Sequence, residues 1–271
     1  MKKFAIIGLG YIAPRHLEAI KSVGGTVVAA CDVHDCGGIL DSYNLHCLFF
    51  RSEIDFFNHI SPENTDYLVV CTPNRLHFAH TYAAVAKGIS VICEKPLFTL
   101  RHQADLLQPY AHKIFCILQL RLHPMMDQVR AALANQQTPK IELYYHTPRG
   151  QWYEKSWKSD PQNGGVLMNI GIHLFDLLIF LLGEPLSTTI SRYDTKTAHG
   201  VSVFPTAEVH WELSTDPYLE PTRSIVIDDS VFFFTQGFTG LHAQSYYQIL
   251  IGNGFTLHDA LPALDMVMGM R

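Results

Sequence analysis

Hydrophobic positions in the first 118 residues form short apolar runs, separated by stretches in which apolar residues recur at helical spacing. The runs predicted as strands are residues 4–8, 26–32, 45–50, 67–71, 90–94 and 113–120. The stretches predicted as helices are residues 14–23, 52–60 (behind a serine cap), 77–88 and 101–110. Apolar strands that alternate with helices are typical of an α/β fold with a parallel sheet covered on both faces.

The pattern changes after Gln119, where a predicted helix at 123–136 leads into a strand-like run at 140–148. Further strand-like runs are residues 187–194, 207–214, 223–229 and 231–237. Asp228 and Asp229 stand between the last two runs and are predicted as a hairpin turn. Long strands after few helices favour an α+β domain with an open, mostly antiparallel sheet. The sequence therefore predicts two domains, 1–118 and 119–271.

A glycine-rich loop, GLGYIA at residues 8–13, follows the first predicted strand and opens the first helix. In that context Gly8 permits a tight turn, Gly10 lets the backbone approach a pyrophosphate, and Ala13 allows close packing of helix on strand. Asp32 ends the second strand, where an acid binds the ribose hydroxyls of adenosine and repels a 2′-phosphate. We therefore expect a Rossmann domain at 1–118 that binds NAD in preference to NADP.

Composition narrows the class of protein. The chain is 48% hydrophobic and 17% charged, as in a soluble enzyme, and its net charge of -5 argues against a general nucleic-acid binder. Its longest apolar run, residues 177–182, is far shorter than the ~20 residues that span a bilayer. The six cysteines form no CxxC pair, which predicts free thiols and a cytoplasmic location, and no motif predicts a metal site.

Polar residues interrupt one of the most apolar segments, GGVLMNIGIHLFDLLIFLLG at 164–183. It is predicted as a buried helix, yet it contains His173 and Asp176, with Asn169 just before them. Its glycines, at 164, 165 and 171, are expected to let the backbone lie against a substrate. Two further motifs, CTPNRLH at 71–77 and CEKP at 93–96, end apolar strands at the carboxyl edge of the sheet, where such folds bind ligands.

These motifs together resemble the glucose–fructose oxidoreductase, inositol dehydrogenase and rhizopine catabolism (Gfo/Idh/MocA) family, over nearly the whole chain. The resemblance implies that Lys95 lies beside the nicotinamide ribose and the reacting hydroxyl, and that His173 accepts the proton of a sugar hydroxyl. Many members have an aspartate where this chain has Asn169, so Asn169 is expected to orient a substrate hydroxyl. Asp176 is expected to support the helix through a buried hydrogen bond, with a direct catalytic role as the alternative. The resemblance thus implies that Lys95, His173 and Asn169 are the catalytic residues.

The implied cofactor contacts share the loops at the carboxyl edge of the sheet. They are Gly8, Gly10, Tyr11, Ile12, Asp32, Thr72, Pro73, Asn74, His77, Glu94, Lys95 and Gln119. Arg121, in the segment QLRLHP at 119–124, is a candidate substrate contact.

Several longer strings, among them RGQWYEKSWKSDP at 149–161 and NIGIHLFD, resemble one branch of the family. Its members oxidise the 3-hydroxyl of a UDP-linked N-acetylated amino-sugar uronic acid in bacterial O-antigen (lipopolysaccharide) synthesis, and a partner aminotransferase uses the 3-keto product. Arg149, Trp157 and Lys158 would bind the anionic substrate, unless 149–161 is only a surface loop. The resemblance also implies a homotetramer built through the open sheet, and leaves open whether 2-oxoglutarate reoxidises NADH.

Two other functions fit the sequence. One is an NAD-dependent dehydrogenase of a free sugar or inositol, and the other is an NAD-binding regulator without catalysis. The presence of both Lys95 and His173 argues against the regulator.

Overall fold

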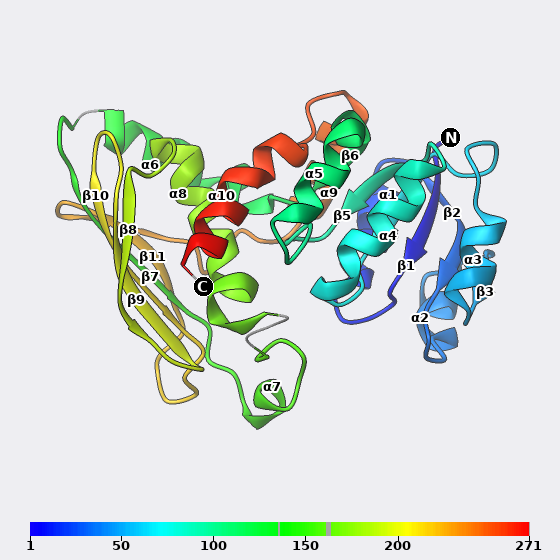
Figure 1. Cartoon of the computed structure of the whole chain (residues 1–271), viewed down its shortest axis with the longest axis horizontal. Coiled ribbons are helices and arrows are strands. Elements are labelled where there is room, and N and C mark those ends of the chain that lie inside the picture. The colour runs from blue at the N-terminus through cyan, green and yellow to red at the C-terminus, as the bar shows by residue number, and fades with distance from the viewer. Residues whose placement is uncertain (135, 161–163, 271) are drawn as a thin grey trace. The chain divides into compact units, whose positions relative to one another are not determined.

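The computed structural model describes residues 1–134, 136–160 and 164–270, which fall into two compact units (Figure 1). Unit 1 contains Met1–Ile117 together with Gly240–Ala260, and unit 2 contains Leu118–Thr239 and the segment that begins at Leu261. The sequence placed residues 240–260 in the second domain, and this differs from the structure. The helix α9 (Leu241–Leu250) packs against α1 (Ala13–Ser22) instead, and its Tyr246 is fully buried.

Unit 1 is built on a parallel sheet with the strand order β3-β2-β1-β4-β5-β6. Its strands are β1 (Lys3–Ile7), β2 (Thr26–Cys31), β3 (Leu48–Phe50), β4 (Tyr67–Val70), β5 (Ser90–Cys93) and β6 (Ile114–Cys116). The order reverses between β1 and β4, which is where dinucleotide-binding folds open a crevice at the carboxyl ends of the strands. The α/β prediction for this half of the chain is therefore confirmed.

The other helices of unit 1 connect these strands. They are α2 (Gly37–Ser42), α3 (Glu53–His59), α4 (Asn74–Ala86) and α5 (His102–Leu107), the last continued by a 3-10 turn at Gln108–Lys113. The predicted serine cap is present, because Ser52 Oγ accepts a hydrogen bond of 3.2 Å from the Asp55 amide at the start of α3. The short helix α2 was not predicted, since its sequence GGILDS carries no helical period.

Unit 2 contains a mixed sheet with the order β12-β11-β7-β10-β9-β8, in which only β7 and β10 run parallel among the paired strands described. Its strands are β7 (Lys140–His146), β8 (Ser187–Tyr193), β9 (Thr197–Val203), β10 (Glu208–Ser214), β11 (Thr222–Ile227) and β12 (Ser230–Phe233). The predicted hairpin turn is confirmed, and Asp228 adopts a positive φ of 49° there. The mostly antiparallel sheet is confirmed as well.

Strand β9 was missed because its sequence TAHGVSV is polar and contains a glycine. Gly200 lies under the Trp211 ring, where a Cβ would stand 2.3 Å from the nearest ring carbon. The same ring packs edge-on against Phe175 of α8 (Ile172–Leu182), with centroids 5.1 Å apart. This contact places α8 on the face of the sheet that carries Trp211, as Figure 1 shows for the helix and the sheet.

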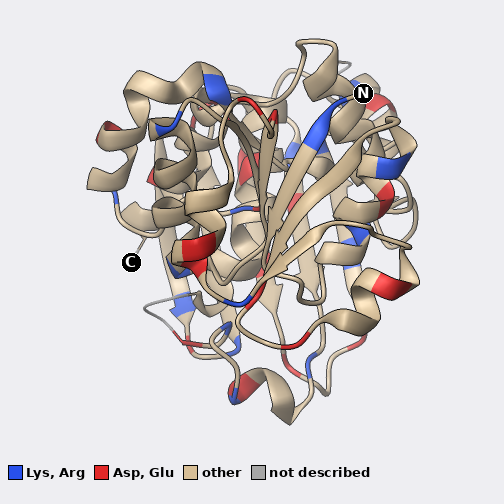
Figure 2. Cartoon of the chain, turned by 90° about the vertical axis from the view of Figure 1, so that its right-hand side faces the viewer, with Lys and Arg blue, Asp and Glu red and all other residues tan. Residues whose placement is uncertain are grey.

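The remaining elements of unit 2 are a 3-10 turn (Gln119–Leu122), α6 (Met125–Ala134), α7 (Gln151–Glu154) and a π-helix (Leu167–Gly171). The last helix, α10 (Leu257–Gly269), begins in unit 1 and ends in unit 2 and, like α9, was not predicted. Basic and acidic residues are interspersed along the chain, as the coloured ribbon of Figure 2 shows. Within the described ranges, no helix is both long and apolar enough to cross a membrane.

Candidate active site

The loop after β1 has the shape that a dinucleotide requires. Gly8 has a φ of 89°, and a Cβ on it would lie 2.7 Å from the backbone of Cys71 and Thr72, so no other residue fits. At Gly10, by contrast, no atom of the described residues lies within 4 Å of a Cβ position. That space is at the N-terminus of α1, whose amides and dipole attract phosphate. The loop therefore has room for a pyrophosphate at Gly10, and the contact itself stays a prediction.

Asp32 is held beside this loop. Its Oδ2 accepts a 2.7 Å hydrogen bond from the Leu9 amide, and its Oδ1 accepts one of 2.9 Å from the His34 amide. Two backbone donors fix the carboxylate at the end of β2 and leave lone pairs for ribose hydroxyls. Of the two other predicted loop contacts, Tyr11 projects into solvent and Ile12 is half-buried.

The predicted contacts after β4 begin with Thr72 and Pro73, which lead into α4, and with a buried Asn74. His77 is also buried, and its Nδ1 lies 2.6 Å from the Pro96 carbonyl and its Nε2 2.7 Å from the Thr72 carbonyl. Burial lowers the pKa of His77, while the two carbonyl oxygens oppose that shift by favouring a protonated ring. The structure thus makes His77 a brace between two loops.

The two charged residues of the CEKP motif at 93–96, Glu94 and Lys95, differ in burial. Glu94 is 7% exposed and directs its carboxylate into unit 1, toward His16 and His242. Lys95 follows at the carboxyl end of β5 and is half-buried.

Gln119 and Arg121, both in the 3-10 turn of unit 2, have different partners. Gln119 is buried, and its Oε1 has no hydrogen-bond partner among the described residues, which fits the predicted role as a ligand contact. Arg121 forms a buried ion pair with Asp176 of α8, through Nη2–Oδ1 and Nε–Oδ2 distances of 2.7 and 3.1 Å. The guanidinium predicted to meet substrate is therefore bound to the helix, and Asp176 has the supporting position expected of it.

Asn169 and His173 come from the start of the apolar segment, which has an unpredicted π-helical turn. Such turns occur frequently at functional sites. Asn169 lies in the π-turn and its Nδ2 donates a 2.9 Å hydrogen bond to the Tyr153 hydroxyl. His173 is the second residue of α8 and is half-buried.

Two glycines of the segment 164–183, Gly164 and Gly171, are explained by close packing and not by the predicted contact with a substrate. A Cβ on Gly171 would lie 2.8 Å from the Phe175 ring and 2.9 Å from Leu213 Cδ1. A Cβ on Gly164 would lie 2.7 Å from the Lys158 carbonyl oxygen. These glycines are thus needed for packing within unit 2, whereas Gly165 adopts a positive φ of 59°.

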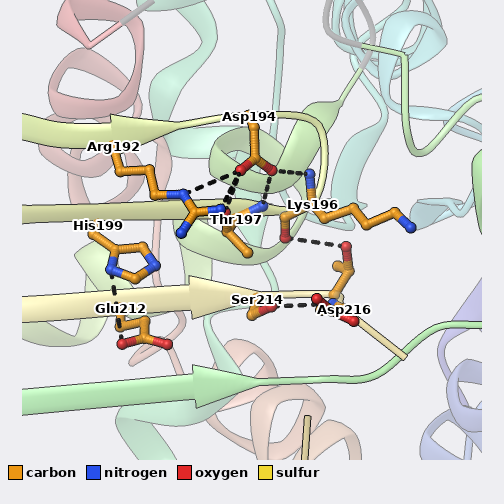
Figure 3. Close-up of polar contacts among 9 residues, drawn as sticks. Arg192, Asp194, Lys196, Thr197, His199, Glu212, Ser214 and Asp216 are labelled. Atoms are coloured by element: carbon orange, nitrogen blue, oxygen red, sulfur yellow. Dashed lines mark hydrogen bonds and ion pairs between the residues drawn. The ribbon is translucent and has the colours of Figure 1, made fainter. Parts of the chain in front are cut away.

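A hollow of about 220 Å³ opens in unit 2. Its lining residues come from three separate segments and are Arg149, Tyr153, Glu154, Ser159, Thr195, Lys196 and Thr215. One wall is the β8–β9 turn in Figure 3, where Asp194 Oδ1 accepts hydrogen bonds of 2.8 and 2.9 Å from the amides of Lys196 and Thr197. Of these residues only Arg149 was predicted individually. Tyr153, Glu154 and Ser159 lie in the predicted segment 149–161, and no motif marks the other three.

Two cations, Arg149 and Lys196, and one acid, Glu154, line this hollow. Lys196 Nζ pairs with Glu154 at 2.8 Å, but no acidic partner of the Arg149 guanidinium occurs in the described parts of the chain. Lys158 stands nearby, over the rings of Trp152 and Trp157 at 5.9 and 5.7 Å. Burial and then the positive charge of Arg149 lower the pKa of Lys158. Two cations that repel each other beside a hollow fit an anionic ligand. The predicted segment's last residue, 161, lies outside the described residues.

Comparison with known proteins agrees with this geometry. The NAD-binding Rossmann profile of the Gfo/Idh/MocA oxidoreductases matches residues 2–121, and the profile of their C-terminal alpha/beta domain matches residues 139–230. The chain belongs to the Gfo/Idh/MocA oxidoreductase family. Its cofactor is NAD, as the loop and Asp32 predicted.

Two solved structures of a Thermus thermophilus family member are similar along almost the whole chain. The WlbA (WbpB) dehydrogenase in complex with NAD and UDP-GlcNAcA is 33% identical, with a TM-score of 0.91 over 98% of this chain and 94% of that one. The same dehydrogenase with NAD and alpha-ketoglutarate is 35% identical, with a TM-score of 0.90 over 97% and 93%.

A curated relative, D-glucoside 3-dehydrogenase of Escherichia coli, is 31% identical over 136 residues. The match covers 47% of this chain and 39% of that protein, so the chain spans well under half of the relative's length.

Proposed function

We propose that the protein is a UDP-N-acetyl-2-amino-2-deoxy-D-glucuronate dehydrogenase, which oxidises the sugar 3-hydroxyl to a ketone. The observation that carries this proposal is the cationic hollow of unit 2, whose wall residue Tyr153 is hydrogen-bonded to Asn169. A site for anionic groups is thereby joined to a residue expected to orient the sugar. The similarity to a dehydrogenase crystallised with NAD and UDP-GlcNAcA supports the same substrate class.

The chemistry assigned to the chain is proton removal and charge stabilisation. A bound NAD would supply the acceptor for the hydride of the sugar carbon. His173 takes the hydroxyl proton on an imidazole nitrogen, a role that suits a histidine near neutral pH. Lys95 stabilises the alkoxide character that develops on the oxygen. Asn169, fixed by the Tyr153 hydroxyl, orients the sugar and leaves the proton transfer to His173.

The anionic groups of the substrate are assigned to the cations around the hollow. The guanidinium of Arg149 suits a carboxylate or phosphate, which it can bind in bidentate fashion. Lys158, whose pKa burial lowers, regains a favourable environment for its charge when an anion arrives. Trp157, which lies beneath that ammonium, offers a ring face to the sugar or base.

The proposal is tested by incubating the protein with NAD and the UDP-sugar acid, with 2-oxoglutarate as a further acceptor, and following the 3-keto product by mass spectrometry. UDP-N-acetylglucosamine, which lacks the carboxylate, is the matched control substrate. We expect turnover of the acid, and a loss of about 10²–10⁴-fold in His173→Asn with unchanged NAD affinity. Normal turnover in His173→Asn would remove the histidine from its role.

A second candidate, a dehydrogenase of a free sugar or inositol, is favoured by the similarity to D-glucoside 3-dehydrogenase. Competition distinguishes the two, because UDP alone inhibits an enzyme that binds the nucleotide and leaves a free-sugar dehydrogenase unaffected. NAD binding without turnover of either substrate class would indicate the regulator.

The proposed reaction also implies partners and a setting. A 3-keto nucleotide sugar is a substrate for an aminotransferase, and such a pair of steps fits bacterial O-antigen sugar synthesis in the cytoplasm. The surface proposed for a homotetramer is the face of the unit 2 sheet opposite Trp211. Glu208 and His210 are among its exposed residues. Light scattering of the purified protein measures that assembly directly.

A further inference from the structure

A buried polar cluster in unit 1 joins three elements that are far apart in the sequence. Glu94, at the end of β5, accepts hydrogen bonds on one oxygen, Oε1, from His16 Nε2 of α1 at 2.9 Å and from His242 Nε2 of α9 at 3.1 Å. His16 Nδ1 lies 2.8 Å from the hydroxyl of Tyr246, also on α9. The side chains of all four residues are buried.

The hydrogen bonds define the protons of the cluster. Each histidine carries a proton on Nε2 to donate to Glu94, and the Tyr246 hydroxyl donates to the bare Nδ1 of His16. Burial lowers the pKa of His16 and raises the pKa of Tyr246 well above its ordinary value. Burial also raises the pKa of Glu94, but the hydrogen bonds from His16 and His242 outweigh it and hold that pKa well below the usual range. Glu94 is therefore an anion that its two histidine donors stabilise.

The topology places this anion at one end of the cofactor. Asp32 at the end of β2 marks the adenosine end, and the loop after β1 marks the pyrophosphate. Because the strand order continues β1-β4-β5, the nicotinamide half of a bound cofactor would extend over the ends of β4 and β5. Glu94 follows β5 directly, on the same side of the switch point as the nicotinamide half of a bound cofactor.

We propose that Glu94 is a buried counter-charge that favours the oxidised cofactor over the reduced one, and that His16 and His242 are positioning residues that keep it ionised. The oxidised nicotinamide ring carries a positive charge and the reduced ring is neutral, so a fixed anion stabilises only the oxidised form. Lys95 has the opposite sign but is only half-buried, and water screens its charge more than that of Glu94. The return of residues 240–260 to unit 1 supplies one of the two donors.

The inference depends on NAD and not on the identity of the sugar, so binding tests it without any substrate. The full chain is stripped of nucleotide, and its dissociation constants are measured for NADH by fluorescence and for NAD⁺ by calorimetry. In Glu94→Gln we expect NAD⁺ affinity to fall at least tenfold relative to NADH affinity, about 1.4 kcal/mol. Glu94→Asp keeps the charge and is expected to stay within threefold of the wild-type ratio.

The same two dissociation constants are measured for variants of His242. These variants test the proposal even if Glu94→Gln fails to fold. His242→Leu removes a hydrogen-bond donor to Glu94, and we expect NAD⁺ affinity to fall at least threefold relative to NADH affinity. His242→Gln keeps an N–H donor, and we expect the wild-type ratio of the two affinities. Equal losses of both affinities would show a purely structural cluster and overturn the proposal, as would an unchanged ratio in His242→Leu. One ring nitrogen each of His16 and His242 and one carboxylate oxygen of Glu94 lie within 4.8 Å of one another, a spacing that could hold a metal ion. A stoichiometric metal ion found in the purified protein would therefore also overturn the proposal.

Discussion

Breaking the ion pair between Arg121 and Asp176 is expected to destabilise unit 2 severely. The two side chains are only 6% and 3% exposed, and two nitrogens of the guanidinium lie within 3.1 Å of carboxylate oxygens. Asp176→Asn keeps the shape but leaves a buried positive charge without its counter-ion. Removing one partner of a buried pair costs about 3–5 kcal/mol, of the same order as the whole stability of a typical domain.

Urea unfolding followed by tryptophan fluorescence measures this loss as a lower midpoint at constant slope. The matched control is the exposed pair Arg101–Asp105, with a 3.7 Å separation and side chains 54% and 82% exposed. Asp105→Asn is expected to change the free energy of unfolding by about 0.5 kcal/mol or less.

A double variant separates charge from packing. Arg121→Met combined with Asp176→Leu removes both charges and keeps apolar volume, so it should recover most of the stability lost in Asp176→Asn. A loss below about 1 kcal/mol in Asp176→Asn, as for an exposed pair, would refute the reasoning, because it would mean that water reaches the guanidinium.

Further substitutions and a rise in pH have distinct expected results. Asp32→Ser should narrow the preference for NAD over NADP, measured as a ratio of dissociation constants, and an unchanged ratio would contradict the ribose assignment. Gly171→Ala should destabilise the protein by about 1–3 kcal/mol through overpacking, whereas Gly10→Ala should weaken NAD binding at unchanged thermal stability. Because burial lowers the pKa of Lys158, its charge is lost as pH rises through a value below that of an ordinary lysine, and affinity for the UDP-sugar should fall there. Lys158→Arg, which stays protonated, should keep its affinity at alkaline pH.

Features encoded by neighbouring residues could be read from the sequence. The parallel sheet follows from uninterrupted apolar runs, and the pyrophosphate loop follows from Gly8 and Gly10 between a strand and a helix. The structure gives the physical reason for each, since Gly8 needs its positive φ and Gly10 needs its open space. The hairpin at Asp228 was likewise a local signal.

Features made by distant residues could not be read in this way. The hollow around Arg149 requires the β8–β9 turn, which was invisible because β9 has no apolar alternation strong enough to mark it. The cluster around Glu94 draws on His16 and His242, and no spacing rule connects those positions. Gly171 was interpreted as a substrate-facing glycine because sequence does not show that Phe175 and Leu213 occupy the space beside it.

Buried acidic residues beside proposed catalytic residues have the same explanation in both units. Asp176 lies one helical turn after His173 and is anchored by Arg121, while Glu94 directly precedes Lys95 and is anchored by two histidines. In each case a buried carboxylate, held by several hydrogen bonds, fixes the backbone next to a residue proposed to react. Buried charges are poor sources of net stability, but they tolerate little displacement because each lost bond leaves a charge uncompensated. That intolerance is what holds a base or a cation to the accuracy that catalysis requires.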